Sequence, residues 1–377
     1  MRTSTSRMAH ELEQLRLSSN YRSFPQNDGG TIIDLTSNDY LGLASRNDLK
    51  DEFLDINDNG RRIELTSSAS RLLAACQKEY SMFETMLSDI YRRDALLFNS
   101  GYHANAGIIQ AIADKRTLIV ADKLVHASII DGIRLSAARF TRFPHNDFNR
   151  LEKIVAGADS DVDRILVIVE SVYSMDGDRA DIDRLIRLRR TDPRIMLYVD
   201  EAHGVGVEGP SGLGLVAASE APAEVDIVIG TLGKALASSG AFLLTDRVIK
   251  EYLVNKARSL IFSTALPPAC VAWSRFIFSK MTGMDTERAT LRRHARQLAE
   301  AISAATGRQG VVSHIQPLII GDAAATLKRS SVLLRQGVKV LPIRTPTVPP
   351  GSERLRFSLS ASLTDADIAH ACRCIKT

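Results

Sequence analysis

The 377-residue sequence predicts an α/β fold in which helices cover both faces of a mostly parallel sheet, with a smaller α+β domain after it. Two observations predict this fold. Through the middle of the chain, short apolar runs alternate with amphipathic segments, and each run is continuous, as in strands buried on both faces. Several runs end at or next to a polar residue, which is typical of a ligand site at the carboxyl edge of such a sheet.

Five apolar runs are the expected strands of this sheet. They are residues 117–121 (TLIVA), 165–169 (ILVIV), 195–199 (IMLYV), 226–230 (DIVIG) and 241–245 (AFLLT). Around these runs, apolar residues recur every three or four positions, which is the helical period. Examples are Tyr80, Phe83, Leu87 and Ile90, and later Ile182, Leu185 and Ile186. Strands and helices therefore alternate as they do in βαβ units.

The two ends of the chain differ in character from its middle. Residues 1–45 are expected to form an N-terminal arm, and residues 46–284 the large domain. Residues 285–377 begin with a long charged helix that leads into three short strands, in QPLII, VKVLP and RLRFSLS. Thr364 then caps a final helix, so this part is expected to be a small α+β domain.

The composition excludes several classes of protein. With 45% apolar and 24% charged residues it is that of an ordinary globular protein. No apolar stretch approaches the roughly 20 residues of a membrane helix, and the first residues hold no apolar signal segment. We therefore expect a cytoplasmic protein without membrane contact. The net charge of +4 and the scattered basic doublets argue against nucleic-acid binding and suit small anionic substrates.

The four cysteines, at positions 76, 270, 372 and 374, indicate neither a disulfide framework nor a metal site. No pair has Cys-x-x-Cys spacing, and no histidine completes a metal set. Buried thiols in a reducing compartment are expected, and no metal is expected.

Lys234 follows an apolar run in the stretch GTLGK, which at first suggests a nucleotide phosphate loop. Such a loop requires G-x-x-x-x-G-K-[ST]. Val228 stands where the first glycine should be, and Ala235 stands where the hydroxyl residue should be. Both requirements fail, so a lysine that forms a covalent bond is the better interpretation.

The ends of four runs carry Asp122, Glu170, Asp200 and Thr231, and together they predict one site. Asp200 could hold a proton on a pyridine-type nitrogen, which keeps the ring of pyridoxal phosphate an electron sink. His203 could hydrogen-bond a phenolic oxygen of that ring, although a structural Asp–His turn is the alternative. A neutral, partly desolvated lysine forms Schiff bases, which suits Lys234.

Three further segments could contribute to this site. The turn NSGYHANAG (99–107) precedes a helix, whose first backbone N–H groups bind phosphate, and Thr231 could add a hydroxyl. His126, just past a strand end, could stack on a flat ring or could be structural. Ser174 is a candidate hydrogen-bond donor to the cofactor.

Seven motifs, in the order SNDYLGL, SGYHANAG, DKLVHAS, ESVYSMDGD, VDEAHGVG, GTLGKA and FSTALPP, resemble those of the α-oxoamine synthases. The resemblance runs from about residue 35 to the C-terminus. These are fold-type I pyridoxal 5'-phosphate enzymes that condense an amino acid with an acyl thioester and release CO₂. Residues 142–155, 315–322 and 343–361 are most similar to the members that join L-alanine to a pimeloyl thioester, carried by coenzyme A or acyl carrier protein, in biotin biosynthesis.

For the cofactor, the resemblance implies a role for each matching residue. Lys234 carries the cofactor covalently and moves the α-proton, Asp200 pairs with the pyridinium nitrogen, and His126 stacks on the ring. The remaining cofactor residues are His203 and Ser174 at the phenolic oxygen, Ala202 on the second ring face, and Gly101, Tyr102 and Thr231 at the phosphate. Thr264, in the Ser263-Thr264 stretch, would come from the neighbouring subunit, so the enzyme would be a homodimer with shared sites.

For the substrate, the resemblance implies that Asn38 and Arg356 bind the carboxylate of the amino acid. A guanidinium grips a carboxylate through two hydrogen bonds. Arg354 shares the same strand face, so physical chemistry alone does not choose between the two arginines, and the family position favours Arg356. The family's N-terminal substrate arginine has no exact match, and Arg22 is the nearest candidate.

Two stretches depart from the family pattern. TSSASR (66–71) stands where relatives have a glycine-rich GSGGSR-like stretch, and LASSG follows Lys234 where relatives often have glycines. The first departure makes the acyl partner less certain. Other α-oxoamine synthase activities, with glycine or serine or with another acyl group, are therefore alternatives, and so is a partner subunit without catalysis.

Overall fold

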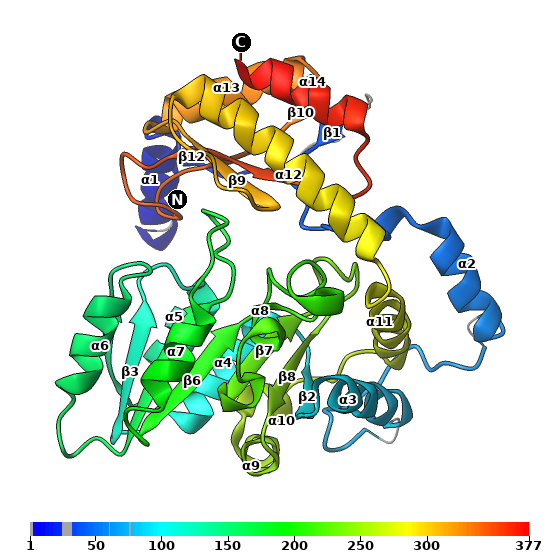
Figure 1. Ribbon diagram of the computed structural model, residues 1–377, viewed down its shortest axis with the longest axis vertical. Coiled ribbons are helices and arrows are strands. Elements are labelled where there is room, and N and C mark those ends of the chain that lie inside the picture. The colour runs from blue at the N-terminus through cyan, green and yellow to red at the C-terminus, as the bar shows by residue number, and fades with distance from the viewer. Residues whose placement is uncertain (1–2, 25–31, 60, 75–76, 377) are drawn as a thin grey trace. The chain divides into compact units, whose positions relative to one another are not determined.

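The computed structural model describes residues 3–24, 32–59, 61–74 and 77–376, which form two compact units (Figure 1). The sheet unit comprises Leu41–Ser174 and Asp178–Arg288. The terminal unit comprises Met1–Tyr40, Met175–Gly177 and Ala289–Thr377. The terminal unit thus joins the two ends of the chain, which the sequence analysis treats as an arm and a small domain. That three-part division stays a prediction.

A seven-stranded sheet forms the centre of the sheet unit (Figure 1). Its order is β2-β8-β7-β6-β5-β3-β4, and all strands are parallel except β8. The strands are β2 (Asp94–Phe98), β3 (Thr117–Asp122), β4 (Arg139–Phe143), β5 (Arg164–Glu170), β6 (Ile195–Asp200), β7 (Ile227–Thr231) and β8 (Ala241–Thr245). The predicted mostly parallel α/β sheet is confirmed.

Two strands of this sheet were not expected from the sequence. The edge strand β4 has the sequence RFTRF, whose side chains are mostly exposed, so it lacks the continuous apolar run of a buried strand. The strand β2 follows directly after a helix, and its short sequence DALLF is not long enough to distinguish a strand from the end of that helix. Both strands form because the neighbours β3 and β8 offer them backbone hydrogen bonds.

Apolar side chains are buried on both faces of the sheet, because successive residues of a strand point to opposite sides. On one face, Leu166, Ile168 and Ile229 belong to a core that also contains α4 and α5 residues. On the other face, Phe242 packs edge-on against Phe278 of α11, with ring centroids 6.0 Å apart. The helices of this unit are α2 (Asn47–Ile56), α3 (Lys78–Tyr91), α4 (Gly101–Ile112), α5 (Ala127–Leu135), α6 (Phe148–Ala156), α7 (Ile182–Arg189), α8 (Leu215–Ala218), α9 (Arg247–Lys256), α10 (Arg258–Ile261) and α11 (Pro268–Met281).

The terminal unit is a small α+β structure, as the sequence predicts. Three antiparallel strands in the order β11-β12-β9 form its larger sheet, and β1 pairs in parallel with β10. Its strands are β1 (Ile33–Asp34), β9 (Ile315–Ile319), β10 (Val338–Lys339), β11 (Leu341–Ile343) and β12 (Arg354–Ser358). Its helices are α1 (Thr3–Leu17), α13 (Ala323–Arg335), α14 (Asp365–Lys376) and most of α12 (Asp285–Thr306).

Within the described part of the chain, the helices are too short or too polar to cross a bilayer. Of the cysteines, Cys270, Cys372 and Cys374 are free thiols, and Cys76 lies outside the described residues.

Candidate active site

The polar ends of four neighbouring strands come together at the carboxyl edge of the central sheet. Asp122, Glu170, Asp200 and Thr231 are the last residues of β3, β5, β6 and β7, which are adjacent in the strand order. Glu170 and Asp200 are directly opposite each other in the β5–β6 register. The three acids are buried, and burial of so many acidic groups at one edge indicates a binding site rather than ordinary turns.

Asp200 is held by two donors. The backbone N–H of Ala202 donates to its Oδ1 at 2.8 Å, and Asn105 donates through Nδ2 to its Oδ2 at 2.7 Å. The hydroxyl of Tyr198 in turn donates to Oδ1 of Asn105 at 2.6 Å, which fixes the orientation of the amide. Asn105 was missed from the sequence. Its signal is an amide on the otherwise apolar buried face of α4, two residues before Gly107.

His126 is linked to Asp200 through the same amide. Its Nδ1 accepts the backbone N–H of Ser128 at 3.2 Å and lies 2.7 Å from the Ser128 hydroxyl, which accepts from Asn105 at 2.9 Å. Burial lowers the pKa of His126, and the charge of Lys234 lowers it further against the opposing effect of Asp200. The neutral form of the His126 imidazole is thus favoured.

Glu170 is a second buried acid of this edge. Among the described atoms, its Oε1 has no hydrogen-bond partner, while its carboxyl accepts from the backbone of His126. Burial raises the pKa of Glu170 well above its usual value, and the charge of Asp200 raises it further. The two acids therefore differ: Asp200 has donors for its charge, and Glu170 is kept protonated.

The predicted phosphate residues lie side by side. Helix α4 begins at Gly101, and its N-cap Ser100 accepts from the backbone N–H of His103. A Cβ added at Gly101 would lie 2.7 Å from Cγ2 of Thr231, so only glycine allows this approach. The side chain of Tyr102 turns away and donates to Asp131 of α5. The exposed N–H groups of this helix start, together with the hydroxyl of Thr231, suit an anion.

The turn after β6 is organised by a residue that sequence reasoning missed. Glu201 is fully buried, and its carboxylate accepts from the Ser171 hydroxyl and from the backbone N–H of Val216. A Cβ at Gly204 would lie 1.9 Å from Oε2 of Glu201, which explains the glycine there. Burial raises the pKa of Glu201 to about 7. This anchoring fixes the turn that carries Ala202 and buried His203, and Thr231 donates to the Ala202 carbonyl at 3.3 Å.

Lys234 stands on a tight loop after β7. The backbone closes this loop through hydrogen bonds from Leu232 to Gly240 at 3.0 Å and from Ala237 to Lys234 at 2.9 Å. The side chain is half-buried, and its charge acts on both His126 and Glu170. The structure thus brings the lysine within electrostatic reach of His126 and of the strand-end acid Glu170.

Ser174 follows β5 in a turn whose base is a bridge between Val172 and Arg179. This base is held by His145, whose Nδ1 lies 3.0 Å from Asp122 Oδ1 and whose Nε2 lies 2.7 Å from Asp178 Oδ2. Burial alone would lower the pKa of His145, but the two carboxylates outweigh it and raise the pKa to about 10. His145 is therefore a charged clamp beside the turn that carries Ser174, and the sequence analysis did not identify it.

Thr264 lies beside the phosphate turn of its own chain. Its backbone pairs with Ser70, and its carbonyl accepts from Nδ2 of Asn99 at 2.5 Å. Asn99 immediately precedes the N-cap of α4 and also donates to the Ser263 hydroxyl at 3.0 Å. Ser68, in the TSSASR stretch (66–71), has a left-handed backbone with φ 51°, a region that residues other than glycine rarely adopt.

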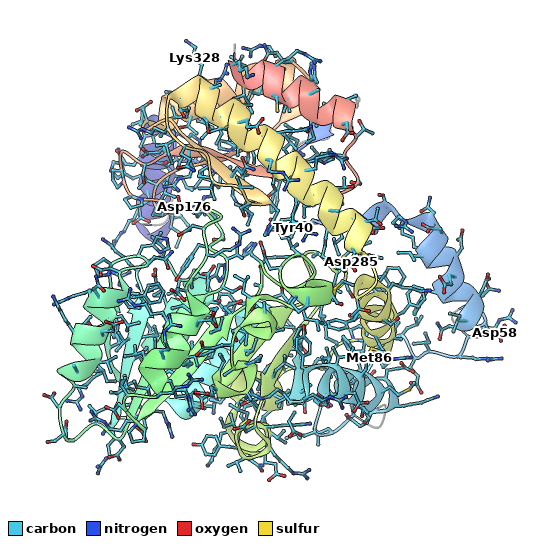
Figure 2. The ribbon with its side chains drawn as sticks, viewed as in Figure 1. Tyr40, Asp58, Met86, Asp176, Asp285 and Lys328 are labelled. Atoms are coloured by element: carbon cyan, nitrogen blue, oxygen red, sulfur yellow. The ribbon has the colours of Figure 1, made fainter. Side chains whose placement is uncertain are left out.

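Asn38 and Arg356 meet in the terminal unit. Arg356 donates through Nη2 to Oδ1 of Asn38 at 3.1 Å, and the hydroxyl of Tyr40 donates to the same oxygen at 3.0 Å. Burial raises the pKa of Tyr40 to about 12. Arg354 forms an ion pair with Asp176. Figure 2 labels Tyr40 and Asp176. The ion pair gives Arg354 a structural partner and leaves Arg356 the better candidate for a substrate carboxylate.

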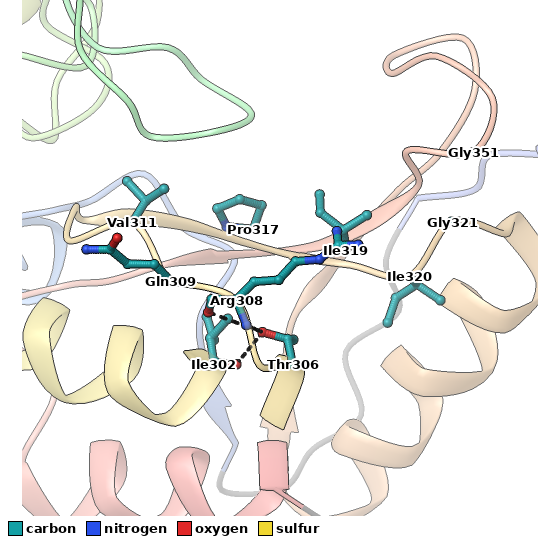
Figure 3. A pocket seen from close by; sticks show the side chains of 11 residues that line it. Ile302, Thr306, Arg308, Gln309, Val311, Pro317, Ile319, Ile320, Gly321 and Gly351 are labelled. Carbon is teal, nitrogen blue, oxygen red and sulfur yellow. Dashed lines mark hydrogen bonds between the residues drawn. The ribbon is translucent and has the colours of Figure 1, made fainter. Parts of the chain in front are cut away.

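Arg22, the third predicted substrate residue, is exposed and donates to the Thr347 hydroxyl at 2.9 Å. A cavity of about 540 Å³ elsewhere in the terminal unit contains none of the predicted site residues (Figure 3). Its walls include Ile302, Pro317 and Ile319 and its one charged side chain is Arg308. The predicted residues therefore form two groups: the cofactor group in the sheet unit and the carboxylate group in the terminal unit.

The residues of the sheet unit fit pyridoxal 5'-phosphate. The helix start at Gly101 suits its phosphate and buried Asp200 suits its ring nitrogen, while the buried Oε1 of Glu170 has no hydrogen-bond partner among the described atoms. Among the described residues no group of acidic, histidine and cysteine side chains is arranged to hold a metal ion.

Known proteins are similar to this chain over nearly its whole length. Residues 30–375 match the family model "Aminotransferase class I and II". The chain is 45% identical to a Pasteurella multocida protein named "Putative 8-amino-7-oxononanoate synthase", over 97% of both chains, and 43% identical to a Haemophilus influenzae protein of the same name, over 97% of this chain and 98% of that one.

Two solved structures are also similar. The serine palmitoyltransferase of Sphingomonas wittichii has a TM-score of 0.89 and 28% identity, covering 99% of this chain and 96% of that one. The 8-amino-7-oxononanoate synthase of Francisella tularensis has a TM-score of 0.77 and 29% identity, covering 93% of this chain and 98% of that one. The fold-type I architecture and the resemblance to the α-oxoamine synthases are confirmed.

Proposed function

Because this chain belongs to the class I and II aminotransferase family, and within it to the pyridoxal-phosphate-dependent α-oxoamine synthases, we propose that it condenses L-alanine with a pimeloyl thioester. The products are 8-amino-7-oxononanoate, CO₂ and a free thiol, and the reaction belongs to biotin biosynthesis. Full-length identities of 43–45% to the relatives of that name support this substrate pair. We expect the enzyme to act in the cytoplasm, on a thioester of coenzyme A or acyl carrier protein.

The observation that carries the proposal is the cluster around Asp200. One hydrogen-bonded chain joins His126, Ser128, Asn105 and Asp200, and Lys234 acts electrostatically on the same group. When bound, pyridoxal phosphate supplies the electron sink for carbanion chemistry at Cα. Asp200 holds the proton on the ring nitrogen, while His126 covers one ring face.

The other residues of the sheet unit orient the cofactor. The backbone N–H groups of Gly101 and Tyr102, with the hydroxyl of Thr231, bind the phosphate. His203 and Ser174 hydrogen-bond the phenolic oxygen. Ala202 covers the second ring face, where its small side chain allows close approach.

Lys234 and Arg356 divide the work on the amino acid. The Nζ of Lys234 would carry the cofactor until the amino acid displaces it, and the freed amine would then accept and return the α-proton. Arg356, with Asn38, would grip the carboxylate. By fixing the orientation of the carboxylate, Arg356 would select the bond at Cα that is cleaved, which is Cα–H before acylation and C–CO₂ after it. Arg22 is the candidate for the family's N-terminal substrate arginine.

We also propose a homodimer in which Thr264 contributes to the partner's site. An apolar surface supports this: Leu65, Leu72, Leu73 and Phe262 are 52–80% exposed. The two segments that carry them lie side by side, since Ala265 donates to the Ala69 carbonyl at 2.9 Å. Four exposed apolar side chains on adjacent segments indicate a surface that a second subunit covers.

The cofactor role of Lys234 is tested by absorption spectroscopy. Purified protein supplied with pyridoxal phosphate should show the visible absorption band of the lysine-bound cofactor, and borohydride should abolish it by reducing the C=N bond. Lys234→Ala should lack the band and should not become labelled by cofactor and borohydride. A wild-type protein without this band refutes the proposed function.

Substrate choice needs a separate assay, because solved serine palmitoyltransferases resemble this chain closely in fold and make serine a second candidate. Release of free thiol from pimeloyl-CoA is measured with L-alanine, glycine and L-serine, and the product mass is determined. L-alanine should give the highest kcat/KM. A higher value with glycine or serine shows a different α-oxoamine synthase, and preference for palmitoyl-CoA with serine shows the second candidate.

A further inference from the structure

The loop that carries Lys234 contains a strained residue. Ala237 has a backbone φ of 43°, in the left-handed region that residues with a Cβ rarely adopt. Glycine adopts such angles without a steric cost. A strained backbone of this kind persists only where its surroundings hold it, and it often marks a functional site.

Helix α11 holds this residue from outside the loop. The indole N–H of Trp273 donates to the carbonyl of Ala237 at 3.2 Å. The next residue, Ser274, is fully buried, and its hydroxyl lies 2.7 Å from that of Ser238. The helix thus contacts two successive residues of the loop through polar groups.

Trp273 is itself fixed by aromatic neighbours. Its ring packs edge-on against Phe53 of α2, with centroids 5.2 Å apart, and is stacked with Phe276 at 5.8 Å. A rigid donor loses little freedom when it forms its hydrogen bond, so it can impose a conformation on the loop. It is also the only tryptophan of the chain.

The strained residue is connected directly to the lysine. The N–H of Ala237 donates to the carbonyl of Lys234 at 2.9 Å, and Ser238 donates to Leu232 at 2.9 Å. A change of φ at Ala237 would move the atoms that fix the backbone of Lys234 and would redirect its side chain.

We propose that Trp273 and Ser274 of α11 are positioning residues that hold Ala237 in its left-handed conformation and so fix the direction in which the side chain of Lys234 points. This inference rests on the proposed role of Lys234 as the cofactor lysine. The contacts of Trp273 with Ala237 and of Ser274 with Ser238 are together called the brace.

The test combines removal of the brace with removal of the strain. Trp273→Phe keeps the ring and its packing but deletes the N–H. The pH midpoint of the absorption band of the lysine-bound cofactor should shift, and the dissociation constant of the cofactor should rise about two- to tenfold, the range expected for one hydrogen bond. Adding Ala237→Gly should restore both values, because glycine adopts φ 43° without the brace.

Two matched controls accompany these variants. Tyr91→Phe also deletes one aromatic hydrogen-bond donor, but its hydroxyl donates to the carbonyl of Leu213 at 3.2 Å outside this loop, so it should leave the band titration unchanged. Ser68→Gly relieves another left-handed non-glycine residue (φ 51°) outside this loop, and it should not rescue Trp273→Phe. Thermal unfolding of every variant without cofactor separates a general loss of stability from an effect on the lysine.

The possible results are distinct. An unchanged band titration in Trp273→Phe overturns the brace, and so does a shift that Ala237→Gly fails to reverse or that Ser68→Gly reverses equally well. A wild-type protein without the band overturns the proposed function itself, whereas a normal wild-type band with insensitive variants overturns only this inference.

Discussion

His145 should make the stability of this protein depend on pH over an unusual alkaline range. Its ring lies between Asp122 and Asp178, with both nitrogens within 3.0 Å of a carboxylate oxygen. The ring of Tyr173 packs edge-on against it at 4.4 Å, and Asn146 donates to both carboxylates. Protonated His145 therefore ties the end of β3 to the turn that carries Ser174.

The sign and size of the effect follow from linkage. The pKa of His145 is about 10 in the folded protein, against 6.5 for an ordinary histidine. The stabilisation is therefore fully present below pH 6.5 and is lost as pH rises through about 10. At about 1.4 kcal/mol for each pKa unit, the shift corresponds to a ceiling of about 5 kcal/mol. Because the side chain is 24% exposed and the carboxylates are coupled, we expect about 2–3 kcal/mol.

The assay is urea unfolding of the cofactor-free protein between pH 6 and pH 10.5, for wild type and His145→Gln. Glutamine can hydrogen-bond one carboxylate but cannot carry the charge. The difference between the two unfolding free energies should be largest near pH 6 and should shrink toward pH 10. Subtraction removes the contributions of other groups with raised pKa values, such as Glu201. His10→Gln, on the exposed face of α1, is the matched control. A difference that is constant with pH would refute the reasoning.

Three further changes test the site. Gly101→Ala should weaken cofactor binding about tenfold or more, because its Cβ would lie 2.7 Å from Cγ2 of Thr231. Adding Thr231→Ser removes that methyl group and should recover most of the affinity. No recovery would disprove the contact. Glu170→Gln should leave the absorption band and its pH titration nearly unchanged, because a protonated carboxyl resembles an amide, and a large shift would show that Glu170 acts as a carboxylate. Arg356→Lys should raise the KM for L-alanine about tenfold, since an ammonium group cannot form the paired hydrogen bonds of a guanidinium, and the cofactor band should be unaltered. An unchanged KM would show that Arg356 does not bind the carboxylate.

The sequence predicts the buried strands well because a strand covered on both faces must be apolar throughout. The runs at 165–169 and 195–199 lie within β5 and β6. The same rule explains why β4 is missed, since β4 lies at the edge of the sheet and exposes most of its side chains. Its pairing depends on β3, which no local pattern in RFTRF reveals.

For the site, the sequence indicates residues that end strands and misses residues that support them. Asp200 is visible because an acid directly after an apolar run is unusual. Asn105 and Glu201 act through contacts with segments 95 and 15 residues away, which only the folded chain brings together. His145 has no signal of its own, because its role depends on two carboxylates from other segments.

The supporting residues explain how one sheet edge can hold several acids and still favour one charge next to the ring nitrogen. Asp200 receives donors from Ala202 and Asn105, so its charge is satisfied. Glu170 lies opposite it in the register, has an oxygen with no described partner and is kept protonated by burial. Asp122 forms an ion pair with protonated His145. The neighbouring acids thus have different environments, so that Asp200 is the single carboxylate at the position proposed for the pyridinium nitrogen. A second negative charge there would strengthen the hold on the ring proton and would oppose the neutral amine that Lys234 needs for its proposed role as a base.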